Sequence, residues 1–156
     1  MKVVIAVVGR VRGGLADAVQ EYEKRAGRYW KLEVHEVDAG VRGGNPDPDR
    51  VKEAEAERLL ARIPPELEVL ALTRDGKGMS SRALSSFLDE HAVRSSSGVA
   101  FVIGGAFGLG TTVLNRARRR LSLSPMTLPH EMARLVLAEQ LYRAGTIRRG
   151  EPYHKG

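Results

Sequence analysis

The sequence contains no cysteine, and this absence excludes several kinds of chemistry. Without thiols the chain has no disulfide bonds, no thiolate nucleophile and no cysteine ligands for zinc. Aromatic residues make up only 5% of the chain, so a platform of rings for stacking single-stranded nucleic acid is not evident. A cysteine-free chain fits a reducing compartment, and we expect a cytoplasmic protein.

Long apolar runs and metal-binding motifs are also missing. The apolar run at residues 3–8 is far shorter than the roughly 20 residues of a membrane-spanning helix, and no small-residue cleavage site follows it. We therefore interpret it as a first strand and expect no membrane association. The four histidines are scattered without His-x-x-x-His spacing, which argues against a metal site, and His91 is expected on the surface.

Positive charge is in excess, with 25 Lys and Arg against 19 Asp and Glu and a net charge of +6. Such an excess attracts polyanions, most often RNA or DNA, although solubility alone also explains it. The densest basic run contains four arginines, and it forms either a solvated face or a surface that holds phosphates without reading sequence. These arginines are Arg116, Arg118, Arg119 and Arg120.

The apolar pattern alternates strands with amphipathic helices over a length that suits one domain, residues 1–156. This alternation predicts an α/β fold whose mostly parallel sheet has helices on both faces. Asp47 followed by Pro48 predicts one helix start, and Ser80 or Ser81 another. The predicted strands are 3–8, 32–37, 67–72, 99–103 and 121–123, and the predicted helices are 15–29, 49–63, 80–93, 112–119 and 129–147.

The stretch "IGGAFGLG" places several glycines directly after a predicted strand. It does not match a dinucleotide fingerprint, because Val113 stands where the third glycine belongs, and the chain has no P-loop. The glycines therefore serve backbone geometry, through positive φ or close approach of a ligand or of another chain segment. Two tight turns without a ligand remain an alternative. The glycines are Gly104, Gly105, Gly108 and Gly110.

Three predicted loops, 72–81, 104–110 and 121–130, each follow a strand. Ligands of open α/β sheets bind beyond the carboxyl ends of strands, so we expect these loops to form one pocket. The third loop alternates apolar and small polar residues, which suits a half-buried wall that offers main-chain groups to an adenine. The last helix is apolar on more than one side and is expected to pack against its own sheet and a second subunit, which predicts a homodimer.

Six motifs in order resemble the RlmH family of SPOUT methyltransferases, and the resemblance runs over essentially the whole chain. The motifs are "VVGR", "EYEKR", "GKGMSS", "IGGAFGLG", "LSLSPMTLPHEMARLVLAEQLYRA" and "GEPYHK". The resemblance implies a trefoil-knotted α/β fold and a cytoplasmic homodimer that uses S-adenosylmethionine. It also implies the substrate, a pseudouridine in 23S rRNA of the large subunit or assembled ribosome, methylated at N3 of the base.

Site residues follow from the resemblance position by position. It implies a role near the target base for four residues, with the C-terminal tail 148–156 of one subunit completing the partner's site. His154 is the candidate base, Arg143 would stabilise negative charge on the base, Tyr153 would stack on it or bond to it, and His130 would act as catalyst or orient its loop. Cofactor binding is implied for Leu72, Gly104, Leu123, Ser124, Pro125, Met126, Thr127 and Leu128.

One departure from the family pattern concerns the first of these loops. Family members often have an acidic residue directly after the leucine that matches Leu72, whereas here Thr73 and Arg74 follow it. Two other functions stay open from the residues alone. One is a non-catalytic, ribosome-associated RNA-binding factor with the same fold, and the other is a flavodoxin-like mononucleotide binder, for which the phosphate loop is missing.

Overall fold

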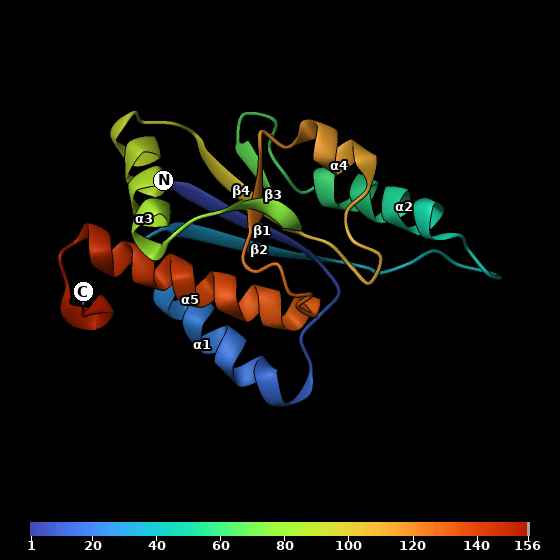
Figure 1. Ribbon diagram of the computed structural model, residues 1–156, viewed down its shortest axis with the longest axis horizontal. Helices are drawn as coiled ribbons and strands as arrows, with labels where there is room; N and C mark the ends of the chain where they lie inside the picture. The colour runs from blue at the N-terminus through green and yellow to red at the C-terminus, as the bar shows by residue number, and fades with distance from the viewer. Residues whose placement is uncertain (156) are drawn as a thin grey trace.

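The computed structural model describes residues 1–155, which form an α/β fold around a five-stranded sheet (Figure 1). All strand pairs are parallel and the strand order is β2-β1-β4-β3-β5, which confirms the predicted class. Gly156, the last residue of the predicted tail, lies outside the described residues. The strands are β1 (Lys2–Val8), β2 (Lys31–Val37), β3 (Glu68–Gly78), β4 (Gly98–Ile103) and β5 (Arg119–Ser122).

Helices cover both faces of the sheet, with α1, α3 and α5 on one face and α2 and α4 on the other (Figure 1). The α-helices are α1 (Ala16–Ala26), α2 (Pro48–Leu60), α3 (Ser81–Val93), α4 (Thr111–Arg116) and α5 (His130–Arg148). Two short 3-10 helices, η1 (Gly13–Leu15) and η2 (Pro152–His154), follow β1 and α5.

The interior strand β1 shows why helices cover both faces of the sheet. Successive side chains of a strand point to opposite faces, and every residue from Val3 to Val8 is buried. Val3, Ile5 and Val7 pack into the core beneath α1, α3 and α5, whereas the residues between them pack into the core beneath α2 and α4. A parallel sheet buried in this way reads as a continuous apolar run in the sequence.

Two predicted helix starts are confirmed by their capping bonds. The Asp47 carboxylate accepts hydrogen bonds from the backbone N–H groups of Asp49 at 2.9 Å and Arg50 at 3.1 Å. The Ser80 hydroxyl accepts one from the N–H of Ala83 at 3.0 Å. Each cap satisfies backbone donors that a helix start otherwise leaves unpaired.

The segment expected to be a loop after Leu72 is instead the second part of β3. Leu72 and Lys77 both align with Leu121 of β5, so the residues between them bulge out of the strand. A Cβ at Gly76 would lie 2.7 Å from the backbone of Arg120, so the strand returns to its partner only because this position has no side chain.

The predicted helix 112–119 was too long at its carboxyl end. Helix α4 ends at Arg116 because Ala117 has extended backbone angles, and Arg119 and Arg120 belong to β5. The basic run is therefore divided between a helix, a turn and an edge strand, and its side chains do not share one helical face.

The expectation that His91 lies on the surface was wrong. Its side chain is buried in the face of α3 that packs on the sheet, at the same helical spacing as Leu84 and Leu88. The ring packs edge-on against Phe87, with centroids 4.8 Å apart, and Nδ1 lies 2.7 Å from the Ser96 hydroxyl oxygen.

Helix α5 packs between α1 and α3 across the sheet (Figure 1). The Trp30 indole donates to the carbonyl of Leu141 at 2.9 Å, and the Ser85 hydroxyl donates to that of Ala144 at 2.9 Å. Contacts within the chain therefore bury much of the apolar surface of α5, and the homodimer stays a prediction. Among residues 1–155, no helix has both the length and the apolar character needed to cross a membrane.

A buried ion-pair cluster joins α5 to α1 and β2. Arg134 is 6% exposed and donates from Nε to Glu23 at 2.6 Å and from Nη1 to Glu36 at 2.5 Å. Both hydrogen bonds favour the charged guanidinium and raise the pKa of Arg134, against the opposing effect of its burial.

Changing Arg134 to methionine is expected to lower the free energy of unfolding by about 2 kcal/mol, because it leaves two carboxylates without their partner. The figure lies below the about 3–5 kcal/mol usual for a broken buried pair, because the Glu36 side chain is 35% exposed and regains water. Urea denaturation of Arg134→Met and wild type measures the difference. Equal stability would mean that the cluster contributes nothing.

Candidate functional site

The residues implied to bind the cofactor follow three adjacent strands, β4, β3 and β5. In the sheet Leu72 aligns with Leu121 on one side, and the preceding Ala71 aligns with Val102 on the other. Gly104 directly follows β4, and residues 123–128 directly follow β5. The structure therefore brings all eight of these residues to the carboxyl edge of the same part of the sheet.

Arg74, the departure from the family pattern, connects two of these segments. Its Nη1 donates to the hydroxyl of Thr127 at 3.0 Å, and its carbonyl accepts from the Ser122 hydroxyl at 3.0 Å. Farther along the third loop, the Ser124 hydroxyl accepts from the N–H of Met126 at 2.9 Å. The bulged part of β3 and the third loop therefore form one connected wall.

The glycine segment after β4 forms a tight turn that closes on itself. Gly108 has φ of +86°, and its N–H donates to the carbonyl of Gly105 at 3.0 Å. A Cβ at Gly104 would lie 2.8 Å from the backbone of Gly108 and 3.1 Å from Leu109. Of the three reasons considered for a missing side chain at Gly104, the structure supports close approach of another part of the chain, Gly108 and Leu109.

The same edge combines half-buried and exposed apolar side chains. Leu72, Leu123 and Leu128 pack partly against the core. Phe107 is 52% exposed and Met126 is 76% exposed, on the loops that follow β4 and β5. Met126 was named as a site residue from the sequence, and Phe107 was not.

His130 begins α5 and lies at the carboxyl end of β1. Its ring packs on Gly9, where a Cβ would lie 3.0 Å from the ring carbon Cε1, and Gly9 has φ of +88°. The Nδ1 atom of His130 is buried and has no hydrogen-bond partner among residues 1–155. A cavity of about 440 Å³ lies beside it, lined by Gly9, Arg10, Arg12 and the end of β2.

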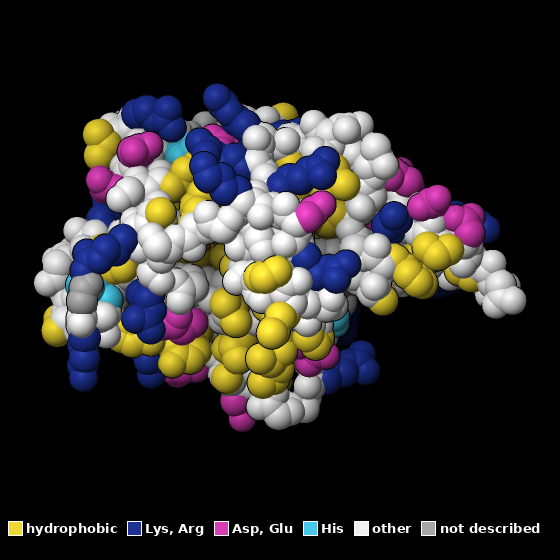
Figure 2. All heavy atoms as spheres, in the orientation of Figure 1, with side chains coloured by type: hydrophobic (Ala, Val, Ile, Leu, Met, Phe, Trp, Pro, Cys, Tyr) yellow, Lys and Arg dark blue, Asp and Glu magenta, His cyan; other side chains and the backbone are white. Residues whose placement is uncertain are grey.

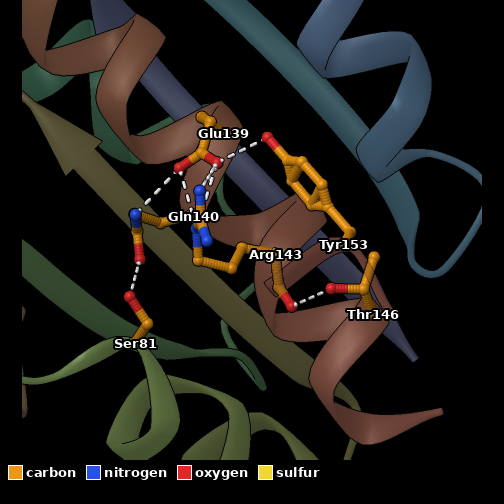
Figure 3. A network of polar contacts seen from close by, with 6 residues as sticks. All are labelled: Ser81, Glu139, Gln140, Arg143, Thr146 and Tyr153. Carbon is orange, nitrogen blue, oxygen red and sulfur yellow. Dashed lines mark hydrogen bonds and ion pairs between the residues drawn. The ribbon is translucent and has the colours of Figure 1, made fainter. Parts of the chain in front are cut away.

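Arg143 and Tyr153 converge on one carboxylate, Glu139 (Figure 3). Arg143 donates to it from Nη2 at 2.6 Å and from Nε at 3.1 Å, and the Tyr153 hydroxyl donates at 2.9 Å. Gln140 donates to the same carboxylate and accepts from Ser81 at the start of α3. Sequence reasoning missed Glu139, although its spacing of four from Arg143 on a helix was a usable signal.

This network fixes the protonation state of Tyr153. Burial and the hydrogen bond to Glu139 raise the pKa of the Tyr153 phenol, because both favour its neutral form. The hydrogen bond from Arg143 to Glu139 likewise raises the pKa of the Arg143 guanidinium. Near neutral pH, Tyr153 is therefore a hydrogen-bond donor and not a base.

A spectroscopic titration tests this assignment. With a raised pKa, Tyr153 stabilises the fold below the ordinary tyrosine pKa of about 10, and this contribution is lost as pH rises through the higher folded value. The difference in tyrosinate absorbance between wild type and Tyr153→Phe is therefore expected to develop only well above pH 10. A difference that titrates at about pH 10 would contradict the network.

Four residues are implied to lie near the target base, and a single chain does not bring all four of them together. Glu139, which holds Tyr153, lies nine positions after His130, about 14 Å along the helix axis. Figure 1 shows the start of α5 and the C-terminal tail at opposite ends of this helix. His154, in η2, has a buried Nδ1 without a hydrogen-bond partner among residues 1–155.

No group of three or more His, Asp or Glu side chains in the described part of the chain is placed to hold a metal ion. The arrangement instead combines an apolar, main-chain-rich wall at one sheet edge with histidines and a neutral tyrosine on α5 and the tail. The wall is suited to bind a small ligand and histidine is suited to move a proton, but within one chain His130 and the tail lie at opposite ends of α5.

Comparison with known proteins decides the family. The family described as "Predicted SPOUT methyltransferase" matches residues 1–154. The chain belongs to the SPOUT methyltransferase family. A methyltransferase requires a methyl donor, so family membership implies a donor site of the S-adenosylmethionine type.

Two curated relatives cover the SPOUT chain almost completely. A protein of Gemmatimonas aurantiaca named "Ribosomal RNA large subunit methyltransferase H" is 56% identical over 99% of this chain and all of its own length. A protein of Clostridioides difficile with the same name is 43% identical, again over 99% of this chain and all of its own length.

A solved structure supports the fold alone. The probable methylase family protein from Haemophilus influenzae Rd KW20 superposes with a TM-score of 0.56 at 14% identity. The match covers 99% of this chain and 70% of that one.

Proposed function

We propose that this chain is a methyltransferase that transfers a methyl group from S-adenosylmethionine to 23S rRNA of the large ribosomal subunit. The observation that carries the proposal is full-length similarity to two relatives named for large-subunit rRNA methylation, one of them 56% identical. From the family resemblance the target is N3 of a pseudouridine, and the enzyme is a single-domain, knotted, cytoplasmic homodimer.

The donor site is proposed at the carboxyl edge of β4, β3 and β5. The half-buried leucines Leu72, Leu123 and Leu128 suit an adenine ring, and the main chain of residues 123–128 supplies polar groups beside them. S-adenosylmethionine supplies an electrophilic methyl group on its sulfonium when it is bound. The residues present at this edge therefore fit the donor that the family implies.

The chain's own residues would position the base and take its proton. N3 of pseudouridine carries a proton that must leave before or during attack. Because Tyr153 is held neutral, we assign the acceptor role to a histidine, with His154 of the tail as the first candidate and His130 as the second. Arg143 already pairs with Glu139 in the free protein, so it would stabilise charge on the base only after that pair loosens.

The separation of His130 from the tail favours a site shared between two subunits. The tail 148–156 of one subunit would supply Tyr153 and His154 to the donor edge of its partner. This arrangement predicts that two inactive variants, Gly104→Val and His154→Ala, regain activity when mixed as a heterodimer.

Methyl transfer tests the proposal directly. Large subunits that lack the modification are incubated with the protein and donor labelled in its methyl group, and label in 23S rRNA is counted. The alternative of a non-catalytic ribosome-associated factor predicts no label and no heat on calorimetric titration with S-adenosylmethionine. Donor binding without transfer to rRNA would also reject the proposal.

A further inference from the structure

A second cavity, of about 520 Å³, opens at the amino edge of the sheet, opposite the candidate donor site. It lies where β3 and β4 begin, and a six-residue strand such as β4 places it about 20 Å from the loops at the other edge. That distance exceeds one nucleotide, so this cavity is separate from the site that would hold the target base. Its lining includes Glu68, His91, Arg94, Ser96, Arg116 and Arg118.

The floor of the cavity is built from one buried polar side chain, His91, and two half-buried ones, Glu68 and Ser96. His91 Nδ1 lies 2.7 Å from the Ser96 hydroxyl, and Nε2 lies 3.2 Å from Glu68, whose side chain is 11% exposed. Ser95 holds this turn with φ of +54°, a conformation that a non-glycine residue adopts at a cost. His91 therefore joins the turn after α3 to the start of β3 in the floor of the cavity.

The side chains that line the cavity carry positive charge that no partner in the described part of the chain compensates. Glu68 is compensated by Arg119, which donates to it at 2.9 Å, and Arg116 is held by the carbonyls of Pro65 and Leu67. Among residues 1–155, Arg118 has no side-chain hydrogen bond or ion pair, and Arg94 donates only weakly to a carbonyl of its own helix at 3.4 Å. Figure 2 shows Lys and Arg side chains gathered where α3 ends and β3 begins.

We propose that this cavity binds a backbone phosphate of the RNA substrate, at a distance from the nucleotide that is methylated. Arg94 and Arg118 would hold the phosphate, since guanidinium groups form paired hydrogen bonds with phosphate oxygens. Arg116 adds charge from a fixed position. Among residues 1–155, the exposed Glu66 is the one carboxylate lining the cavity that has no ion pair, so the three arginines keep the cavity positive.

The proposal rests on the proposed function, which supplies RNA as the polyanion. Phosphate contacts position a protein on RNA and carry no sequence information, so this contact contributes affinity and orientation and leaves the chemistry to the other edge. The proposed phosphate contact also assigns different roles to the arginines of the basic run at residues 116–120. Arg118 binds RNA, whereas Arg116 and Arg119 build the cavity.

The test compares Arg94→Gln/Arg118→Gln with the control Arg28→Gln/Arg50→Gln, which removes two exposed arginines elsewhere and the same net charge. Binding to large ribosomal subunits is measured across a salt series. The cavity variant is expected to bind about three- to tenfold more weakly than the control, with a salt dependence shallower by about one phosphate contact. Calorimetric affinity for S-adenosylmethionine is expected to stay unchanged in both.

Equal loss in the cavity variant and its control would overturn the assignment, because the effect would then come from net charge. A titration with inorganic phosphate, monitored through the amide NMR signals of Ser96 and Gly98, distinguishes an RNA phosphate from a free phosphate ion as the ligand of the cavity. Saturation at millimolar phosphate would indicate a site for free anions and overturn the RNA assignment, whereas shifts with subunit-derived RNA alone support it. Wild-type protein that does not bind large subunits contradicts the proposed function itself and removes the basis of this inference.

Discussion

Replacing Gly104 with valine is expected to abolish binding of the methyl donor while the protein remains folded. A side chain here meets the backbone of Gly108 at 2.8 Å, so the turn after β4 must be rebuilt. The clash lies within one loop beyond the strand, and β4 itself keeps its pairing with β1 and β3. A misplacement of about 1 Å can lower the rate of a positioned reaction by a factor of about 100, and we expect a loss of donor affinity of similar size.

Calorimetry with S-adenosylmethionine measures this loss, and circular dichroism checks the fold. Gly14→Ala is the matched control, because a Cβ at Gly14 meets no atom within 4 Å and its backbone is not left-handed. Wild-type donor affinity in Gly104→Val would show that the loop after β4 is not part of the donor site. Loss of the fold would show that the loop supports the sheet, and the milder Gly104→Ala would then be needed to separate the two roles.

Changing Gly145 to alanine is expected to destabilise the protein by about 3 kcal/mol, the upper end for overpacking. In an exposed helix the same change stabilises the helix by about 1 kcal/mol. A loss of stability in this protein would therefore show by its sign that Gly145 is closely packed. A Cβ at Gly145 would lie 2.4 Å from Cγ of Tyr29. That ring has little freedom to move, because its hydroxyl donates to Glu151 at 2.7 Å and the guanidinium of Arg149 lies 4.6 Å from its centre.

Thermal and urea unfolding measure the effect against Gly27→Ala, whose Cβ makes only ordinary contacts at 3.4 Å. We expect the control to be neutral or slightly stabilised. Because Tyr29 also anchors the tail through Glu151, the Gly145 variant should additionally expose the tail to proteolysis. A Gly145→Ala protein as stable as wild type would contradict the packing of α5 on Tyr29.

The sequence was sufficient for features that depend on local pattern. The continuous apolar run of β1 and the Asp47 and Ser80 caps follow directly from residue types, and the structure has each of them. Segments 104–110 and 121–130 were placed at one sheet edge with Leu72 because parallel strands share the direction of their carboxyl ends, although the predicted loop after Leu72 is part of β3.

Features that depend on distant contacts were missed or misplaced. The second part of β3 exists because Gly76 packs on the backbone of Arg120, a contact that no local pattern predicts. His91 was placed on the surface because histidine is polar, yet Glu68 and Ser96 supply it with polar neighbours inside. Tyr153 meets Glu139 only because the tail folds back along α5.

The most direct test of the account is to locate the methyl group. Large subunits that lack the modification are treated with wild-type protein and labelled S-adenosylmethionine, and the 23S rRNA is digested and analysed by mass spectrometry. We expect the label on one pseudouridine, at N3, and none after treatment with Gly104→Val. Label on another nucleotide would contradict the assigned target, and no label in 23S rRNA would contradict the proposed function.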